Sequence, residues 1–348
     1  MKTAARVRRV SRWWVVGEVF PPSRGPVEVA LARSVREVPQ PGALPGGCVY
    51  EMKFDGWRGV LLVTETRAEL WSRHGTDRSD RFPDLVAAAR SQLVPGVYDG
   101  EIVVWRDGRC DWDALLQRSG SPARVAEQAR RLPASFVAFD LLALHGQDLR
   151  PRPWTDRHAL LEQAAAGWRP PLQLAPHTLD RTEALAWVDG DLTAAGIEGL
   201  VVKGAASPYR AGERQWLKVR TYETGEVVVG AVTGTLEQPT SVIAGRYTPA
   251  GELVIVGRTG PPSPDQAAAL ATTLTPTEDH PWPARIGAGH FGGSPVDLVR
   301  VQPAVVAEVA GDAAQQAGRW RHQLRLIRLR PDLTPAQVEQ HQPLISPG

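Results

Sequence analysis

Short apolar runs recur along the first 220 residues of the chain, and glycine or proline bounds most of them. They are rich in valine, leucine and aromatic residues, which is the composition typical of β-strands. We therefore predict strands over residues 48–54, 59–63, 68–72, 96–105, 134–144, 199–204 and 215–220.

Segments with helix-start signals lie between these runs. Ser121-Pro122, Thr155-Asp156 and Asp180 each stand just before a stretch of helix-forming residues. Such residues cap a helix or fit its first turn, so we predict helices over 123–131, 157–166 and 181–188. This mixture of strands and helices predicts an α+β domain.

The pattern changes after Tyr222. Four strand-like runs with glycine turns follow, over 225–235, 241–248, 251–260 and 303–312, and Ser263-Pro264 opens a helix over 263–274 among them. A small barrel of about five strands with an inserted helix is the pattern of an OB-fold. We expect an N-terminal extension over 1–25, an α+β domain over 26–221, an OB-fold β-barrel over 222–335 and a tail over 336–348.

Charge and composition narrow the classes of function. The chain has 348 residues, a hydrophobic content of 43% and a net charge of +2, which excludes the strong overall positive field of a histone-like protein. Basic residues concentrate in the first dozen positions and over 319–330. Any nucleic-acid surface must therefore be local.

The cysteines and the hydropathy indicate the cellular setting. Cys48 and Cys110 are the only cysteines and form no Cys-x-x-Cys pair, which excludes a disulfide framework and a four-cysteine zinc site. No apolar run approaches the roughly 18 residues that span a bilayer, and the basic N-terminus lacks a signal-peptide core. We expect a cytoplasmic protein that does not enter a membrane.

The chemistry-bearing residues start at Glu51. The phosphate-loop pattern GxxxxGK[ST] does not occur, so a bound nucleotide needs another type of site. In EMKFDGWRG, Lys53 lies at a strand end, Asp55-Gly56 in a tight turn, and Arg58 at the start of the returning strand. These three side chains should converge near one hairpin.

This Lys-x-Asp-Gly-x-Arg pattern resembles the nucleophile motif of the covalent nucleotidyltransferases, a superfamily of ATP-dependent DNA ligases, RNA ligases and mRNA capping enzymes. WSRHG, DGE, FDLL, EGLVVKG and QWLKVR follow in the family's order. The resemblance implies an adenylation domain in which Lys53 forms the lysyl-AMP and Asp55 assists the last step. It further implies that ATP contacts Glu51, Arg58, Arg73, Glu101, Phe139, Lys203, Lys218, Arg220 and Arg330, and that Glu101 and Glu198 hold Mg²⁺ or Mn²⁺.

Several of these residues also have an ordinary structural interpretation. Phe139 on an apolar strand could be a core residue, Glu101 a solvated strand end, and Lys203 and Lys218 surface charges. The ordered set of motifs favours the catalytic interpretation. Only a neutral amine attacks phosphorus, so neighbouring cations and partial burial should favour the neutral form of Lys53.

Two positions depart from the family pattern. Members end the OB domain with Arg-x-Asp-Lys, which orients pyrophosphate, whereas this chain has Arg330-Pro331-Asp332-Leu333. Arg328 or Arg321 could take the place of the missing lysine. Arg220 stands where many ligases have lysine, and arginine binds phosphate as a planar fork.

The sequence around the motifs most resembles that of small bacterial ATP-dependent DNA ligases, namely ligase C and the ligase domain of ligase D. That resemblance implies a monomeric enzyme that seals 5'-phosphate/3'-hydroxyl breaks in nicked or broken duplex DNA during repair. It also implies DNA-repair proteins as partners. An RNA or RNA/DNA hybrid ligase and a catalytically idle DNA-binding relative remain as alternatives. A pure binder gains nothing from acidic groups that face phosphate, which argues against the second.

Overall fold

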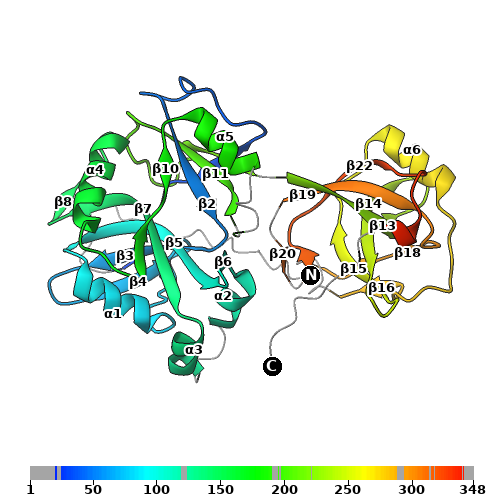
Figure 1. The fold of residues 1–348 in the computed structure, drawn as a ribbon, viewed down its shortest axis with the longest axis horizontal. Coiled ribbons are helices and arrows are strands. Elements are labelled where there is room, and N and C mark those ends of the chain that lie inside the picture. The colour runs from blue at the N-terminus through cyan, green and yellow to red at the C-terminus, as the bar shows by residue number, and fades with distance from the viewer. Residues whose placement is uncertain are drawn as a thin grey trace, which may run out of the picture. The chain divides into compact units, whose positions relative to one another are not determined.

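The computed structural model describes residues 20–21, 25–118, 124–189, 195, 197–220, 222–287, 294–312, 315–316, 318–338 and 340. Most of the predicted extension and tail therefore lies outside the described residues. Contacts divide the chain into two compact units (Figure 1). The first comprises Met1–Met52, Gly56–Ala184 and Leu200–Val219, and the second comprises Lys53–Asp55, Leu185–Gly199 and Arg220–Gly348.

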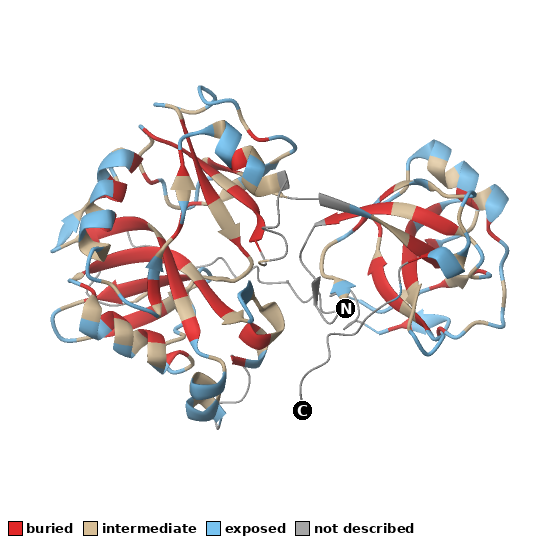
Figure 2. Ribbon diagram, in the orientation of Figure 1, coloured by how far each residue is buried: buried red, intermediate tan, exposed pale blue. Residues whose placement is uncertain are grey.

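A seven-stranded sheet forms the larger part of the first unit. Its strands run in the order β4-β3-β5-β7-β8, with β6 paired to β5 and β9 paired to β7. The strands β5 and β7 are mostly buried (Figure 2). The bounds are β3 (Trp57–Val63), β4 (Ala68–Ser72), β5 (Gly96–Arg106), β6 (Arg109–Cys110), β7 (Ala134–Leu144), β8 (Gln147–Asp148) and β9 (Leu172–Leu174).

A five-stranded sheet carries half of the predicted site residues. Its order is β1-β12-β11-β2-β10. The bounds are β1 (Ala32–Val35), β2 (Cys48–Phe54), β10 (His177–Thr178), β11 (Ile197–Gly204) and β12 (Trp216–Arg220). All seven predicted strands up to residue 220 are confirmed, because each predicted run overlaps a strand of one of these two sheets.

The helices here are α1 (Pro83–Gln92), α2 (Trp112–Arg118), α3 (Val125–Arg131), α4 (Trp154–Ala165) and α5 (Arg181–Asp189). Of these, α1, α2 and α4 pack against the seven-stranded sheet, whereas α3 contacts α2. The three predicted helices are confirmed as α3, α4 and α5, although α4 begins three residues early because Pro153 precedes it at the N-cap. Leu85 and Ala89 of α1 join the buried core beneath the seven-stranded sheet. Among the described residues, no helix is both long and apolar enough to cross a membrane.

An antiparallel six-stranded sheet dominates the second unit, in the order β15-β14-β13-β19-β22 with β18 paired to β13. The four predicted strands and the predicted helix after residue 222 are confirmed. The bounds are β13 (Tyr222–Gly234), β14 (Pro239–Tyr247), β15 (Leu253–Arg258), α6 (Pro264–Thr273), β16 (Arg285–Ile286), β17 (Val296–Asp297), β18 (Val299–Arg300), β19 (Val306–Asp312), β20 (Gln315–Gln316), β21 (Arg319–Trp320), β22 (Arg325–Leu329) and the 3₁₀ turn η2 (Pro335–Gln337).

Local chemistry explains two features of this unit. The Ser263 hydroxyl accepts a hydrogen bond from the backbone of Gln266, whose side chain in turn accepts one from the Ser263 backbone, and this capping box starts α6. Trp282 is buried, and its indole donates to the Leu253 carbonyl oxygen at 2.7 Å. Gly245 of β14 leaves room for the ring, since a Cβ there would lie 2.9 Å from it.

Candidate active site

The hairpin between β2 and β3 has the predicted geometry. Lys53 lies near the end of β2, Asp55 and Gly56 form the turn, and Arg58 is the second residue of β3. Gly56 is needed because a Cβ there would lie 2.8 Å from the Glu101 side chain and would clash with the Ile102 carbonyl oxygen. The Asp-Gly pair therefore lets the turn approach β5 closely.

Lys53 pairs with a buried carboxylate. Its Nζ donates a hydrogen bond to Glu198 on β11, the strand beside β2. Burial, the largest single influence, would raise the pKa of Glu198, but the charge and hydrogen bond of Lys53, the hydrogen bond of Asp55 and the charge of Arg220 together lower that pKa to about 2. The immediate partner of the predicted nucleophile is thus a carboxylate that stays ionised at neutral pH, whereas the sequence led us to expect neighbouring cations there.

Asp55 titrates in the opposite direction. Burial, and then the negative charge of Glu198, raise the pKa of Asp55 to about 7. The two acids beside Lys53 therefore differ in protonation near neutral pH. This separation is the arrangement that lets one carboxyl exchange protons while its neighbour stays charged.

Lys203 is the centre of a second, fully buried network. Its Nζ lies 2.8 Å from Glu51 Oε2 and 3.7 Å from Asp140 Oδ2, and it donates to the Phe139 carbonyl oxygen at 2.8 Å. Arg157 holds both oxygens of Asp140 at 2.8 and 3.0 Å. Burial dominates at Glu51 and raises its pKa to about 7 despite the adjacent Lys203. Lys203 is therefore a buried residue in an ion pair, and the interpretation as a surface charge is wrong.

Arg58 is also committed to a partner. Its Nε and Nη2 bind the two oxygens of Asp99 at 2.9 and 2.6 Å, and Tyr209 donates to Asp99 at 2.7 Å. The guanidinium stacks over Trp216, 4.8 Å from the ring centroid. A role of Arg58 toward ATP stays a prediction. Its observed contacts are those with Asp99 and Trp216.

The other predicted residues of the first unit lie on strands or turns around the same sheets. Phe139 is half-buried, with its ring edge-on to Trp216 at 6.0 Å and Lys203 Nζ 4.8 Å from its centroid. Arg73 is exposed in the turn after β4, where its backbone N–H donates to the Arg58 carbonyl oxygen at 3.3 Å. Glu101 stands opposite Arg58 in the β3–β5 register and is half-buried.

Lys218 and Arg220 are two residues apart on β12, so they lie on the same face of the sheet. Lys218 stands opposite Ser34 of β1. The positive charge of Arg220 acts on Glu198 and helps to lower its pKa, after the larger contribution from Lys53.

Arg330 lies after β22 and is held by acids of the second unit. It binds Asp332 through Nε and Nη2, at 2.9 and 2.8 Å, and Glu226 through Nη1 at 2.8 Å. Leu333 packs against the apolar cluster that contains Val228. The arginine and aspartate of the predicted terminal motif thus pair with each other, and the leucine in place of lysine is partly buried against an apolar cluster.

Comparison with known proteins decides the family. A family model described as "ATP dependent DNA ligase domain" matches residues 30–220. The chain belongs to the ATP-dependent DNA ligase family. It is 33% identical to DNA ligase C2 of Mycolicibacterium smegmatis, over 88% of this chain and 91% of that protein. It is also 33% identical to DNA ligase C of Mycobacterium tuberculosis, over 92% of this chain and 95% of that protein.

A solved structure supports the fold of the ligase. The structure titled "DNA binding with a minimal scaffold: Structure-function analysis of Lig E DNA ligases" covers 87% of this chain and 100% of its own, with 17% identity and a TM-score of 0.53. The ligase thus has the nucleotidyltransferase-type architecture of sheets and helices that the motifs implied.

The sequence analysis did not identify the four residues that hold the predicted cations of the ligase in place, directly or through another residue. Asp99, Asp140, Arg157 and Tyr209 lie in or near the motifs, but their partners are 17 to 151 residues away in the sequence. The signal available was the charge itself, because an acid or arginine inside an apolar strand or helix needs a buried partner. Asp99 and Asp140 are such acids, on β5 and β7.

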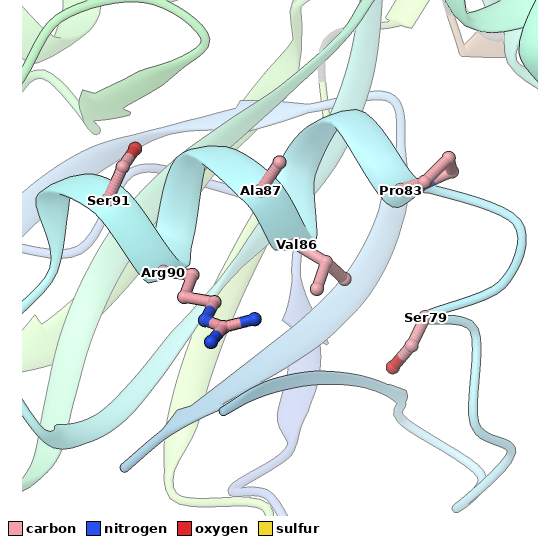
Figure 3. A pocket seen from close by; sticks show the side chains of 6 residues that line it. All are labelled: Ser79, Pro83, Val86, Ala87, Arg90 and Ser91. Carbon is pink, nitrogen blue, oxygen red and sulfur yellow. The ribbon is translucent and has the colours of Figure 1, made fainter. Parts of the chain in front are cut away.

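A shallow pocket lies elsewhere on the ligase, along the exposed side of α1 (Figure 3). None of the predicted site residues lines it, and its lining offers neither a carboxylate nor a nucleophilic lysine. We therefore assign no chemistry to it. The lining residues are Ser79, Pro83, Val86, Ala87, Arg90 and Ser91.

Proposed function

We propose that this ATP-dependent DNA ligase seals 5'-phosphate/3'-hydroxyl breaks in duplex DNA through a lysyl-AMP intermediate on Lys53. The observation that carries the proposal is the pairing of Lys53 with Glu198 on adjacent strands. It places a lysine near the end of β2 and beside an acid that stays ionised. Positioning and charge neutralisation are what phosphoryl-type transfer requires.

Three transfers complete the reaction. Neutral Nζ of Lys53 attacks the α-phosphorus of ATP, so that a P–N bond forms and the bond to the β-phosphate oxygen breaks with loss of pyrophosphate. A 5'-phosphate oxygen of DNA then attacks the same phosphorus, which frees the lysine. Finally the 3'-hydroxyl attacks the 5'-phosphorus and expels AMP.

Asp55 is suited to the proton transfer of the last step. Its pKa of about 7 means that a large fraction can accept a proton near neutral pH, which is the condition for efficient general-base catalysis. We propose that Asp55 receives the proton of the attacking 3'-hydroxyl.

We propose Glu198 and Glu101 as the protein ligands of Mg²⁺ or Mn²⁺. The donor chemistry fits, because Glu198 keeps a carboxylate charged although the residue is only 4% exposed, and hard divalent ions prefer such oxygens. A bound ion would neutralise the charge of the triphosphate. The remaining predicted contacts of ATP, those of Glu51, Arg58, Arg73, Phe139, Lys203, Lys218, Arg220 and Arg330, are part of the same proposal.

We further propose that residues 222–335 form an OB-type domain and residues 26–221 the adenylation domain. An antiparallel sheet of six strands with one inserted helix supports the first assignment. We expect a monomer that works on nicked or broken duplex DNA in the cytoplasm, in repair and together with other repair proteins.

A substrate panel tests the proposal. Wild-type protein and Lys53→Ala are incubated with ATP and Mg²⁺ on nicked, gapped and blunt-ended DNA, on an RNA-containing nick and on a pre-adenylated nick. We expect wild type to seal the DNA nick, and Lys53→Ala to seal only the pre-adenylated one. A stronger preference for RNA-containing nicks would favour the RNA ligase alternative, and failure on every substrate would indicate an idle binder.

A further inference from the structure

Three side chains with metal-binding atoms meet beside the five-stranded sheet, and none of them belongs to the proposed nucleotide site. His158 and Glu162 are one turn apart on α4, and His177 lies on the edge strand β10 (Figure 1). Their ligand atoms all lie within 4.8 Å of one another. His158 Nε2 is 3.5 Å from Glu162 Oε1, and the two imidazole centroids are 4.3 Å apart.

His158 provides an independent indication of a ligand. The residue is only 6% exposed, and both of its ring nitrogens are buried without a hydrogen-bond partner among the described residues. Leaving such polar atoms unsatisfied is unfavourable, so buried imidazoles nearly always have a partner. Trp154 stacks on the ring at 4.3 Å and orients its plane, although no described residue satisfies its nitrogens.

We propose that His158, Glu162 and His177 bind one divalent transition-metal ion of the zinc class. Two imidazole nitrogens and one carboxylate oxygen suit Zn²⁺, whereas Mg²⁺ prefers oxygen ligands alone. In tetrahedral coordination with bonds of about 2.1 Å, neighbouring ligand atoms lie about 3.4 Å apart. The His158–Glu162 pair at 3.5 Å already has this spacing, and the exposed Glu162 side chain can rotate toward His177.

The surrounding charges allow a cation here. Lys203 and Arg157, which lie nearby, are each paired with a buried acid, Glu51 and Asp140 respectively. The carboxylate of Glu162 is half-exposed and pairs with His158. A bound ion would tie α4 to β10 and would brace the residue opposite His177 in the β10–β2 register, which is Glu51.

Metal binding to the full-length, tag-free protein tests this site directly. After chelator treatment, the protein is titrated with Zn²⁺ by calorimetry and with Co²⁺ by visible absorption, which reports tetrahedral coordination. We expect one ion per chain, a higher melting temperature on Zn²⁺ addition, and affinity at least about tenfold weaker in Glu162→Gln and in His177→Ala.

The matched control is His145→Asn. It removes an exposed histidine outside the cluster, and asparagine tolerates the positive φ of 46° at that position. This variant should bind Zn²⁺ like wild type. The proposal is overturned by absence of binding, by unchanged affinity in the well-exposed Glu162→Gln variant, or by a thiolate charge-transfer band that assigns the ion to cysteine.

Discussion

Glu51 lets the buried charge network be tested by the pH dependence of stability. Its pKa rises from an ordinary 4.5 to about 7 in the folded protein, chiefly through burial. Between these values the folded protein binds more protons than the unfolded chain, so stability falls as pH rises. The stabilising contribution of the protonated acid is complete below pH 4.5 and is lost as pH passes 7. At 1.36 kcal/mol per unit, this loss is about 3 kcal/mol.

Glu51→Gln removes this titration while it keeps nearly the same shape. We expect the variant to gain about 3 kcal/mol in free energy of unfolding relative to wild type between pH 4.5 and pH 8. The measurement is urea unfolding at both pH values, followed through the transition of the unit that contains residue 51. Glu127→Gln on α3 is the control, since its side chain is 52% exposed, and it should parallel wild type. If the stability of Glu51→Gln depended on pH in the same way as that of wild type, the raised pKa assigned to the buried Glu51 carboxyl would be refuted.

Three further predictions follow from single contacts. Glu198→Ala should slow single-turnover nick sealing at least about a hundredfold with an unchanged circular dichroism spectrum, because Lys53 and the proposed metal ion would both lose a carboxylate. Near-wild-type turnover at the same magnesium optimum would contradict this. Gly56→Ala should lower the free energy of unfolding by about 1–3 kcal/mol in urea titrations, because the added Cβ meets the Ile102 carbonyl oxygen; an unchanged midpoint would show that the turn can move. Leu333→Lys should cost about 1–2 kcal/mol in the same assay, because a charged side chain replaces a packed one, and equal stability would place residue 333 outside the core.

The elements of this fold were predictable wherever the signal is local. Apolar runs bounded by glycine or proline marked the strands, and Ser263-Pro264 marked the start of α6. The helix α1 was not predicted, although Pro83 and Asp84 at its start are the expected residues for a first turn. Its outer face is exposed, so the apolar signal that remains is weak.

The site could be predicted as a set of residues but not as a set of contacts. The motifs named Lys53 and Glu198, yet no spacing shows that strands 145 residues apart in sequence are neighbours. The same limit applies to Arg58 and Lys203, which were predicted as ATP contacts. In the structure they are held by Asp99 and by Glu51, because burying a cation requires an acid beside it.

Lys53 is the residue proposed to carry AMP, and the small number of lysines makes this easy to test. The chain has four lysines, Lys2, Lys53, Lys203 and Lys218, so peptide mass spectrometry after incubation with ATP and Mg²⁺ can assign an adduct without ambiguity. We predict one adenylyl group, on Lys53 alone, released as AMP when nicked DNA is added and absent from Lys53→Ala. An adduct on another lysine, or one retained in Lys53→Ala, would contradict the central claim.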